Sequence, residues 1–335
     1  MRGSGPIVFC LLTAFVAISP GVARADQPDT TQVFDSSATE IVFVSDTQSP
    51  LFPEMLLLSP NRNQEARSLI FDAILAEKPS AVFHMGDMVA LGFWDASWEA
   101  MDDFVGRLTA AGIPFYPTRG NHELMWFSGM GEANFSKRFP EALRTGYCRK
   151  VGPLAVILLN SNFPHLSDEE ITHQQRWYEE TLAALDADTT VSAVFVACHH
   201  PPFTNSLIVN PSSEVRGQFL PAFLSSRKTL AFISGHAHAM ESFVFSGKRF
   251  LVIGGGGGLQ QPVLIGDRVR WVDEFPLTSE TRMFHYLRCV ATREKMVLSV
   301  QMVRDDIVGF NEVYSLELQC GVAVDSSKTH IEVVK

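Results

Sequence analysis

Hydrophobic and polar positions along the first third of this chain follow the two periods that distinguish strands from helices. Residues 63–77 repeat apolar side chains at the spacing of an amphipathic helix, and a second helix is expected over residues 96–111. Short apolar runs before, between and after these segments predict strands at residues 41–45, 80–85 and 114–118. The resulting β-α-β-α-β order predicts parallel strands joined by right-handed crossovers.

The rest of the chain continues this alternation and then becomes mainly β. Helices are expected over residues 168–186 and 214–225. Strands are expected at residues 147–151 and 154–160, in the runs that lead into His199 and Gly235, and at residues 242–246, 249–253, 283–291, 295–304 and 311–318. The pattern contains no internal repeat and no linker. It predicts an α/β fold in which two sheets pack face to face with helices outside, in one domain over residues 26–335 with a β-rich segment at about 283–320.

Composition and charge narrow the class of protein. The 335 residues are 46% hydrophobic and 19% charged, which is typical of a folded chain with a large core. The formal net charge is −10, and nucleic acids and anionic membranes both require a basic surface. We therefore expect neither as a main partner. The sequence leaves the oligomeric state open.

The first 25 residues have the pattern of an export signal. Arg2 supplies a positive start, Ile7 to Ile18 form a mostly apolar stretch, and Ala23-Arg24-Ala25 provides a small-x-small cleavage pattern before Asp26. The alternative, a membrane anchor, needs an apolar stretch of about 20 residues, which is longer than this one. We expect residues 1–25 to be removed and the mature chain to be soluble, without a membrane segment, in a periplasm or outside the cell.

Four cysteines remain after removal of the signal, which contains Cys10. An oxidising compartment permits disulfides. Cys198 lies in an apolar run and is expected to be a small core residue. Among Cys148, Cys289 and Cys320, a bridge between Cys289 and Cys320 is our prediction.

Polar clusters follow five of the apolar runs. They are Asp46-Thr47-Gln48, Gly86-Asp87, Gly120-Asn121-His122-Glu123, His199-His200-Pro201-Pro202 and Gly235-His236-Ala237-His238. Ligands of open α/β sheets gather at the carboxyl ends of the strands, and all five clusters fall there. Any one of them alone is more often structural: a single histidine is usually a core residue and Gly-Asp is usually a turn. Five in succession predict side chains that converge on one point.

Oxygen and nitrogen ligands in this arrangement suit two metal ions that share a carboxylate. Asp87, on the turn made by Gly86, is the expected bridge. The expected ligands of one ion are Asp46, Gln48 and His238, and those of the other are Asn121, His199 and His236. The run Gly254–Gly258 follows a predicted strand, and we expect its backbone to approach the site closely.

These clusters resemble the motifs of the calcineurin-like metallophosphoesterases, which carry Asp-x-His, Gly-Asp, Gly-Asn-His-Glu or -Asp, a histidine after a strand, and Gly-His-x-His. The resemblance extends from Ile41 to about His238. It implies a four-layer α/β/β/α sandwich of two mixed sheets flanked by helices. It also implies that His122 contacts phosphate without binding metal, and that six residues bind metal: Asp46, Asp87, Asn121, His199, His236 and His238.

The first motif departs from the family pattern, because Gln48 stands where histidine is usual. Some relatives that resemble manganese-dependent ADP-ribose hydrolases also have glutamine there. An amide oxygen is a harder ligand than imidazole, which favours manganese or iron over zinc at this position. The expected cofactors are therefore two metal ions drawn from manganese, iron and zinc.

The resemblance implies hydrolysis of a phosphomonoester or phosphodiester by a metal-bridging hydroxide. His122 would bind the phosphoryl group or donate a proton to the leaving oxygen, and Glu123 would either orient the His122 ring or serve the fold. His200 is a second candidate for contact with substrate. The expected partner is a small phosphorylated molecule.

A nucleotide is one candidate substrate, because several aromatic residues lie near the predicted strand ends. They are Trp94, Trp98, Trp126 and Phe127, and core packing is the commoner role for each. Two other functions keep the same ligands. One is metal-dependent hydrolysis of an amide or ester, and the other is a non-catalytic metal-binding surface module.

The residue three positions after Asp87 generates a first prediction. The purple acid phosphatases, a subgroup of this superfamily, have a ligand tyrosine there, and this chain has Ala90. Iron-loaded protein should therefore lack an intense tyrosinate-to-iron band in its visible absorption spectrum. An intense band would contradict the prediction, and an Ala90→Tyr variant that gains such a band would serve as its positive control.

Overall fold

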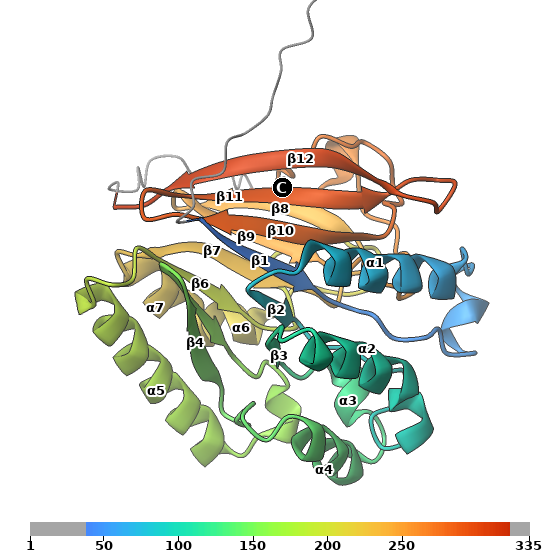
Figure 1. Ribbon diagram of the computed structural model, residues 1–335, viewed down its shortest axis with the longest axis horizontal. Coiled ribbons are helices and arrows are strands. Elements are labelled where there is room, and N and C mark those ends of the chain that lie inside the picture. Colours follow the sequence, from blue (N-terminus) through green and yellow to red (C-terminus); the bar gives the residue numbers. More distant parts are fainter. Residues whose placement is uncertain (1–37, 322–335) are drawn as a thin grey trace, which may run out of the picture. The chain divides into compact units, whose positions relative to one another are not determined.

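The computed structural model describes residues 38–321, which build two six-stranded sheets (Figure 1). The predicted export signal lies outside the described residues. The first sheet has the order β12-β11-β10-β1-β2-β3 and the second the order β4-β5-β6-β7-β9-β8. The first contains β1 (Thr39–Val44), β2 (Ala81–His84), β3 (Phe115–Pro117), β10 (His285–Ala291), β11 (Lys295–Val303) and β12 (Phe310–Gln319). The second contains β4 (Tyr147–Val151), β5 (Leu154–Leu158), β6 (Ala193–Ala197), β7 (Thr229–Ser234), β8 (Met240–Phe245) and β9 (Lys248–Ile253).

Both sheets are mixed. In the first sheet β1, β2 and β3 run parallel, and β10, β11 and β12 are antiparallel to their neighbours. In the second sheet β5, β6, β7 and β9 run parallel, with antiparallel β4 and β8 at the edges. The parallel centre of each sheet therefore directs its carboxyl ends to one edge, where the polar clusters follow.

Helices cover the outer face of each sheet. The longer ones are α1 (Asn63–Glu77), α2 (Glu99–Ala110), α4 (Ser128–Arg138) and α5 (Asp168–Ala187), and the shorter ones are α3 (Asn121–Leu124), α6 (Ser213–Gln218) and α7 (Leu220–Ser225). Short 3₁₀ turns lie at η1 (Glu54–Leu56), η2 (Asp95–Trp98), η3 (Phe163–His165) and η4 (Gly266–Arg268). Apolar side chains of α1 and α2 join the core of the first sheet, and those of α5, α6 and α7 join the outer face of the second. The described residues thus form an α/β/β/α sandwich, as predicted.

The contact between the two sheets forms much of the core. In β5, Leu154, Val156 and Leu158 face the first sheet, whereas Ala155 and Ile157 face the helices. A strand buried on both faces needs an uninterrupted apolar run, which explains the sequence pattern there. The rings of Phe43 on β1 and Phe195 on β6 lie 5.9 Å apart and join the two sheets.

The observed elements depart from the predicted ones in a few places. The predicted helix 96–111 begins as the 3₁₀ turn η2, and the predicted helix 214–225 is divided into α6 and α7. Pro221 lies in the first turn of α7, and proline lacks the backbone N–H that a continuous helix would require there. Helix α4 was not predicted, because only Gly131 and Phe135 are buried along it and its apolar pattern is weak.

The predicted bridge between Cys289 and Cys320 is wrong, since all four cysteines of the described residues are free. Cys289 lies on β10 and Cys320 follows β12, with β11 between them. Strands are about 4.8 Å apart, so two cysteines separated by a whole strand exceed the ~7 Å between Cα atoms that a disulfide allows. Within residues 38–321, no helix has the length and apolar character needed to cross a membrane.

Removal of the Phe195 ring should weaken the contact between the sheets. Phe195 is fully buried, and a Phe195→Ala cavity is expected to lower the free energy of unfolding by about 3–5 kcal/mol. The measurement is equilibrium denaturation in urea. Phe52→Ala makes the same chemical change at a side chain that is 71% exposed, and should leave stability nearly unchanged. Equal effects of the two variants would contradict this packing.

Candidate metal centre

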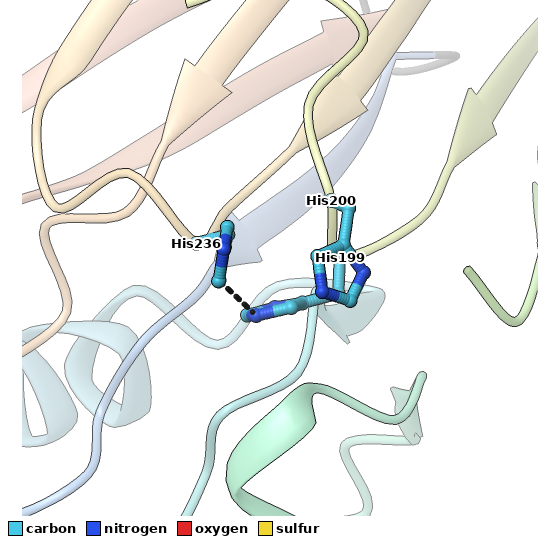
Figure 2. A group of neighbouring side chains, drawn as sticks. All are labelled: His199, His200 and His236. Carbon is cyan, nitrogen blue, oxygen red and sulfur yellow. Dashed lines mark hydrogen bonds between the residues drawn. The ribbon is translucent and has the colours of Figure 1, made fainter. Parts of the chain in front are cut away.

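The predicted ligands lie just beyond the carboxyl ends of parallel strands. Asp46 follows β1, Asp87 follows β2, Asn121 begins α3 beyond β3, His199 follows β6, and His236 follows β7. Figure 2 shows His199, His200 and His236 side by side at this edge, on loops from two different strands. Segments that are far apart in sequence therefore meet at one place.

Three site residues have a left-handed backbone that side chains other than glycine rarely adopt. The φ angles are 58° at Asp46, 55° at Asp87 and 66° at His236. Such residues cost free energy and persist only where surrounding contacts hold them. Here the backbone N–H of Asp46 donates to the Gly86 carbonyl at 3.0 Å, and that of Gln48 to the Asp87 carbonyl at 3.1 Å. The first two metal motifs are thus fixed to each other through the backbone.

The carboxylate of Glu123 gathers the turn that carries Asp87. It accepts the backbone N–H groups of Asp87 at 2.9 Å, Met88 at 2.7 Å, Val89 at 3.3 Å and Gly120 at 2.6 Å. Burial, together with the charge of Asp87, raises the pKa of Glu123 to about 7. Of the two roles considered for Glu123, the structure shows the one that serves the fold.

One group of ligand atoms surrounds His199. The Nδ1–H of His199 donates to the Met85 carbonyl at 2.9 Å, so Nε2 is the nitrogen that faces the other ligand atoms. This Nε2 lies 3.1 Å from Asp87 Oδ2, 3.0 Å from Asn121 Oδ1 and 3.1 Å from His236 Nδ1. The dashed line in Figure 2 marks the contact between the two imidazoles.

A second group surrounds His238. Its Nδ1–H donates to the Leu259 carbonyl at 2.6 Å, and its Nε2 lies 3.3 Å from Asp46 Oδ1. With the Gln48 amide oriented so that its nitrogen donates to the carbonyls of Asp87 and Asp46, its oxygen faces His238 Nε2 at 3.1 Å. Oxygens of Asp46 and Asp87 and a nitrogen of His238 all lie within 4.8 Å of one another. Asp87 therefore borders both groups, as the bridging prediction requires.

Both groups fit metal ions because acceptor oxygens and imidazole nitrogens converge where a positive charge is needed. Burial opposes protonation of His199, but the charge of Asp87 raises its pKa to about 9, so a proton supplies that charge when no metal is bound, and a metal ion would replace it. Histidines that bind metal usually donate their other N–H to a carbonyl or carboxylate, as His199 and His238 do. Burial would raise the pKa of Asp87, but the neighbouring His199 holds it well below its usual value. The donor set thus suits hard or intermediate cations such as manganese, iron or zinc.

His122 lies beside these groups without joining either. Its backbone N–H donates to Asp87 Oδ1 at 2.8 Å, and its Nδ1–H donates to the Ala90 carbonyl at 2.8 Å. Its Nε2 lies 4.0 Å from Asp87 Oδ2 and 3.6 Å from Glu54 Oε1. The ring is therefore oriented by Ala90, and Nε2 is the atom available to a substrate.

His200 is held by a serine and lies against a predicted ligand. Its Nδ1 is 2.9 Å from Ser161 Oγ, and its ring centre is 4.6 Å from that of His236. Burial, with the positive charge of nearby His199, lowers the pKa of His200 to about 3, so the ring is neutral near pH 7. The structure places His200 next to the centre, where contact with a substrate is the role predicted for it.

The glycine run after β9 closes over the second group, as expected for a close backbone approach. A Cβ on Gly258 would lie 2.7 Å from the His238 ring, and a Cβ on Gly254 would lie 2.3 Å from the Ala237 carbonyl oxygen. The backbone N–H of Gly258 donates to the Asp46 carbonyl at 2.8 Å. Side chains at these two glycines would therefore push the loop away from the ligands.

The aromatic candidates divide into two kinds. Trp98 is fully buried and its indole N–H donates to the Gly92 carbonyl, so its role is core packing. Trp94, Trp126 and Phe127 are 58–66% exposed. The ring of Phe93 lies 4.9 Å from Phe127 and 6.2 Å from Trp126, which makes one exposed aromatic group.

Replacement of Glu123 should weaken metal binding, although Glu123 is not one of the predicted ligands. Glutamine at this position keeps one acceptor oxygen but turns an N–H toward backbone N–H groups, so we expect Glu123→Gln to lower the free energy of unfolding by about 2–4 kcal/mol. Bound metal, measured by elemental analysis after dialysis, should fall well below the wild-type amount. The matched control is Glu214→Gln on an exposed turn of α6, which should retain wild-type stability and wild-type metal content. Full metal content in Glu123→Gln would contradict the role given to Glu123.

Three solved structures show the same fold at low sequence identity. They are "GAP50 the anchor in the inner membrane complex of Plasmodium" (13% identity, TM-score 0.59, covering 86% of this chain and 90% of that one), a purple acid phosphatase from yellow lupin seeds (15%, 0.58, 84% and 54%) and a dimetal phosphatase from Danio rerio (15%, 0.52, 84% and 98%). This chain spans about half the length of the lupin protein.

Among curated proteins, none matches this chain. The family model described as calcineurin-like phosphoesterase does match, over residues 39–240, which include every predicted ligand of both groups. Since that span is more than half of the chain, the protein belongs to the calcineurin-like phosphoesterase family.

Proposed function

We propose that this protein is an exported metal-dependent phosphohydrolase that cleaves a phosphomonoester or a phosphodiester. The observation that carries the proposal is the meeting of two ligand groups at Asp87, with His122 directed to the same place. Family membership and the likeness to a purple acid phosphatase and a dimetal phosphatase support this class of reaction. The N-terminal sequence supports export.

Different side chains would bind the two metal ions. Asp46, Gln48 and His238 would hold one ion, Asn121, His199 and His236 the other, and Asp87 both. When bound, two cations supply an acidified water as nucleophile at neutral pH and offset the charge that develops on the phosphoryl oxygens. Manganese, iron or zinc would fit these donors, with manganese or iron favoured beside Gln48.

His122 is the proposed catalytic residue. Because Ala90 holds its Nδ1–H, only Nε2 can meet the phosphoryl group or the leaving oxygen, by a hydrogen bond or by proton transfer. His200, which lies against His236, is proposed to contact the substrate from the side of the second sheet. The substrate is proposed to be a small phosphorylated molecule, and the exposed aromatic group of Phe93, Trp126 and Phe127 supports a flat moiety such as a nucleobase.

Two other functions would use the same ligands. Hydrolysis of an amide or ester needs the nucleophile but gives no role to a phosphate-directed His122. Inhibition by phosphate or vanadate would distinguish phosphoester hydrolysis from this alternative. A non-catalytic surface module is the second, and the printed title of GAP50 describes an anchor. The ligand side chains, which match the family pattern apart from Gln48, support catalysis instead.

The test is an assay of the metal-loaded protein with p-nitrophenyl phosphate and bis-p-nitrophenyl phosphate. We expect turnover that is lost on chelation and restored by manganese or iron. His122→Ala should lower kcat by about 10²–10⁴-fold, the usual range for loss of a proton-transfer group, while metal content stays near wild type. His173→Ala, at an exposed position of α5, is the control and should change neither kcat nor metal content.

Two outcomes would count against these assignments. Loss of metal in His122→Ala would place His122 among the ligands. Absence of turnover on both substrates by fully loaded wild-type protein would remove the proposed function itself.

A further inference from the structure

A glutamate from outside the family motifs reaches His122. Glu54 begins η1, in the segment between β1 and α1. Its Oε2 accepts the backbone N–H of Leu51 at 2.7 Å, and its Oε1 lies 3.6 Å from His122 Nε2. The side chain is 28% exposed, so the carboxylate is held in place and turned toward the centre.

The position of this carboxylate matters because of what His122 Nε2 faces. The nitrogen lies 3.6 Å from Glu54 Oε1 and 4.0 Å from Asp87 Oδ2. Its other ring nitrogen is bound to Ala90. Among the ion pairs of the described residues, Glu54 has His122 as its one partner, so no lysine or arginine neutralises it there. A phosphoryl oxygen that meets His122 Nε2 would therefore lie next to the Glu54 charge.

We propose that Glu54 is a specificity-determining residue that selects phosphodiesters over phosphomonoesters. This inference rests on the proposed phosphohydrolase function and names its substrate class. A phosphomonoester carries close to two negative charges near pH 7, because its second pKa is about 6, whereas a diester carries one. In the diester, an uncharged ester oxygen replaces one of the charged oxygens. The Glu54 carboxylate repels the doubly charged group more strongly than the singly charged one.

The same segment offers contacts that only a diester can use fully. Phe52, Leu56 and Leu57, on either side of Glu54, are 71–79% exposed. Large apolar side chains in such exposure often mark a binding surface. A diester has a second organic group that such side chains can cover, and a monoester has none. This segment thus repels the second charge of a monoester and offers apolar contact to the second organic group of a diester.

The test is Glu54→Gln in the metal-loaded full chain, with kcat/KM measured for p-nitrophenyl phosphate and bis-p-nitrophenyl phosphate. The amide keeps an acceptor for the Leu51 N–H and removes the charge. We expect kcat/KM for the monoester to rise about tenfold relative to that for the diester, as removal of one nearby charge in a partly screened site predicts. Inhibition by orthophosphate, which is largely a dianion at pH 8, should tighten by a similar factor. Metal content should not change.

Two further variants separate charge from contact. Glu317→Gln removes the same charge from exposed β12 and should leave the ratio of the two substrates unchanged. Phe52→Ser should raise KM for the diester and leave the monoester nearly unaffected. Equal changes of both substrates in Glu54→Gln, or no change in either, would overturn the inference while leaving phosphohydrolase activity established. Failure of the wild type on both substrates would instead reject the function on which it rests.

Discussion

The need for positive charge among the converging ligand atoms is the constraint on which this structure depends. His199 Nε2 lies 3.1 Å from Asp87 Oδ2 and 3.0 Å from Asn121 Oδ1, and both oxygens are acceptors. His238 Nε2 likewise lies 3.3 Å from Asp46 Oδ1 and 3.1 Å from the Gln48 oxygen. Packing of the surrounding sheets must hold these oxygens together, whether a proton on the imidazole or a metal ion supplies the charge. The two buried sheet faces and the carbonyls that fix the His199 and His238 rings provide that rigidity.

Backbone strain and buried hydrogen bonds meet at the same place. Asp46, Asp87 and His236 adopt left-handed conformations, and each directs its side chain from a turn directly after a strand. Glu123 offsets part of this cost, because its carboxylate satisfies four backbone N–H groups that the Asp87 and Gly120 turns leave without partners. A residue outside the predicted ligand set thus holds the turn that carries Asp87, the predicted bridging carboxylate.

The sequence was sufficient to predict most of the fold and the position of every proposed ligand. Helix α1 has the predicted bounds because its apolar spacing is regular and the chain turns left-handed at Lys78, just before Pro79. The metal motifs could be located because each follows a buried run that ends abruptly. Helix α4 could not be predicted in the same way, since it buries little and its composition is mostly polar or small.

The contacts that the sequence could not reveal are those between segments that have no periodic signal. The path of residues 45–62 contains three prolines and only a short 3₁₀ turn, so no pattern predicts that Glu54 returns to His122. Glu123 is adjacent to His122 in sequence, yet its carboxylate does not contact the His122 ring. It accepts backbone N–H groups such as that of Met88, and the His122 ring donates to the Ala90 carbonyl. His122 could thus be predicted from its motif. Of the two roles open for Glu123, orientation of the His122 ring is not the one observed.

The charge of the site explains how an acidic chain can act on an anion. The net charge of −10 would repel a phosphate ester at long range, so attraction must be local. Two divalent cations would carry four positive charges, and Asp46 and Asp87 would offset two of them. Glu54 offsets one more at the side of His122. The remaining local charge is small, and a singly charged phosphate matches it better than a doubly charged one. Glu54 thus tunes a centre whose strength is set by its ligands, and does so from the segment between β1 and α1.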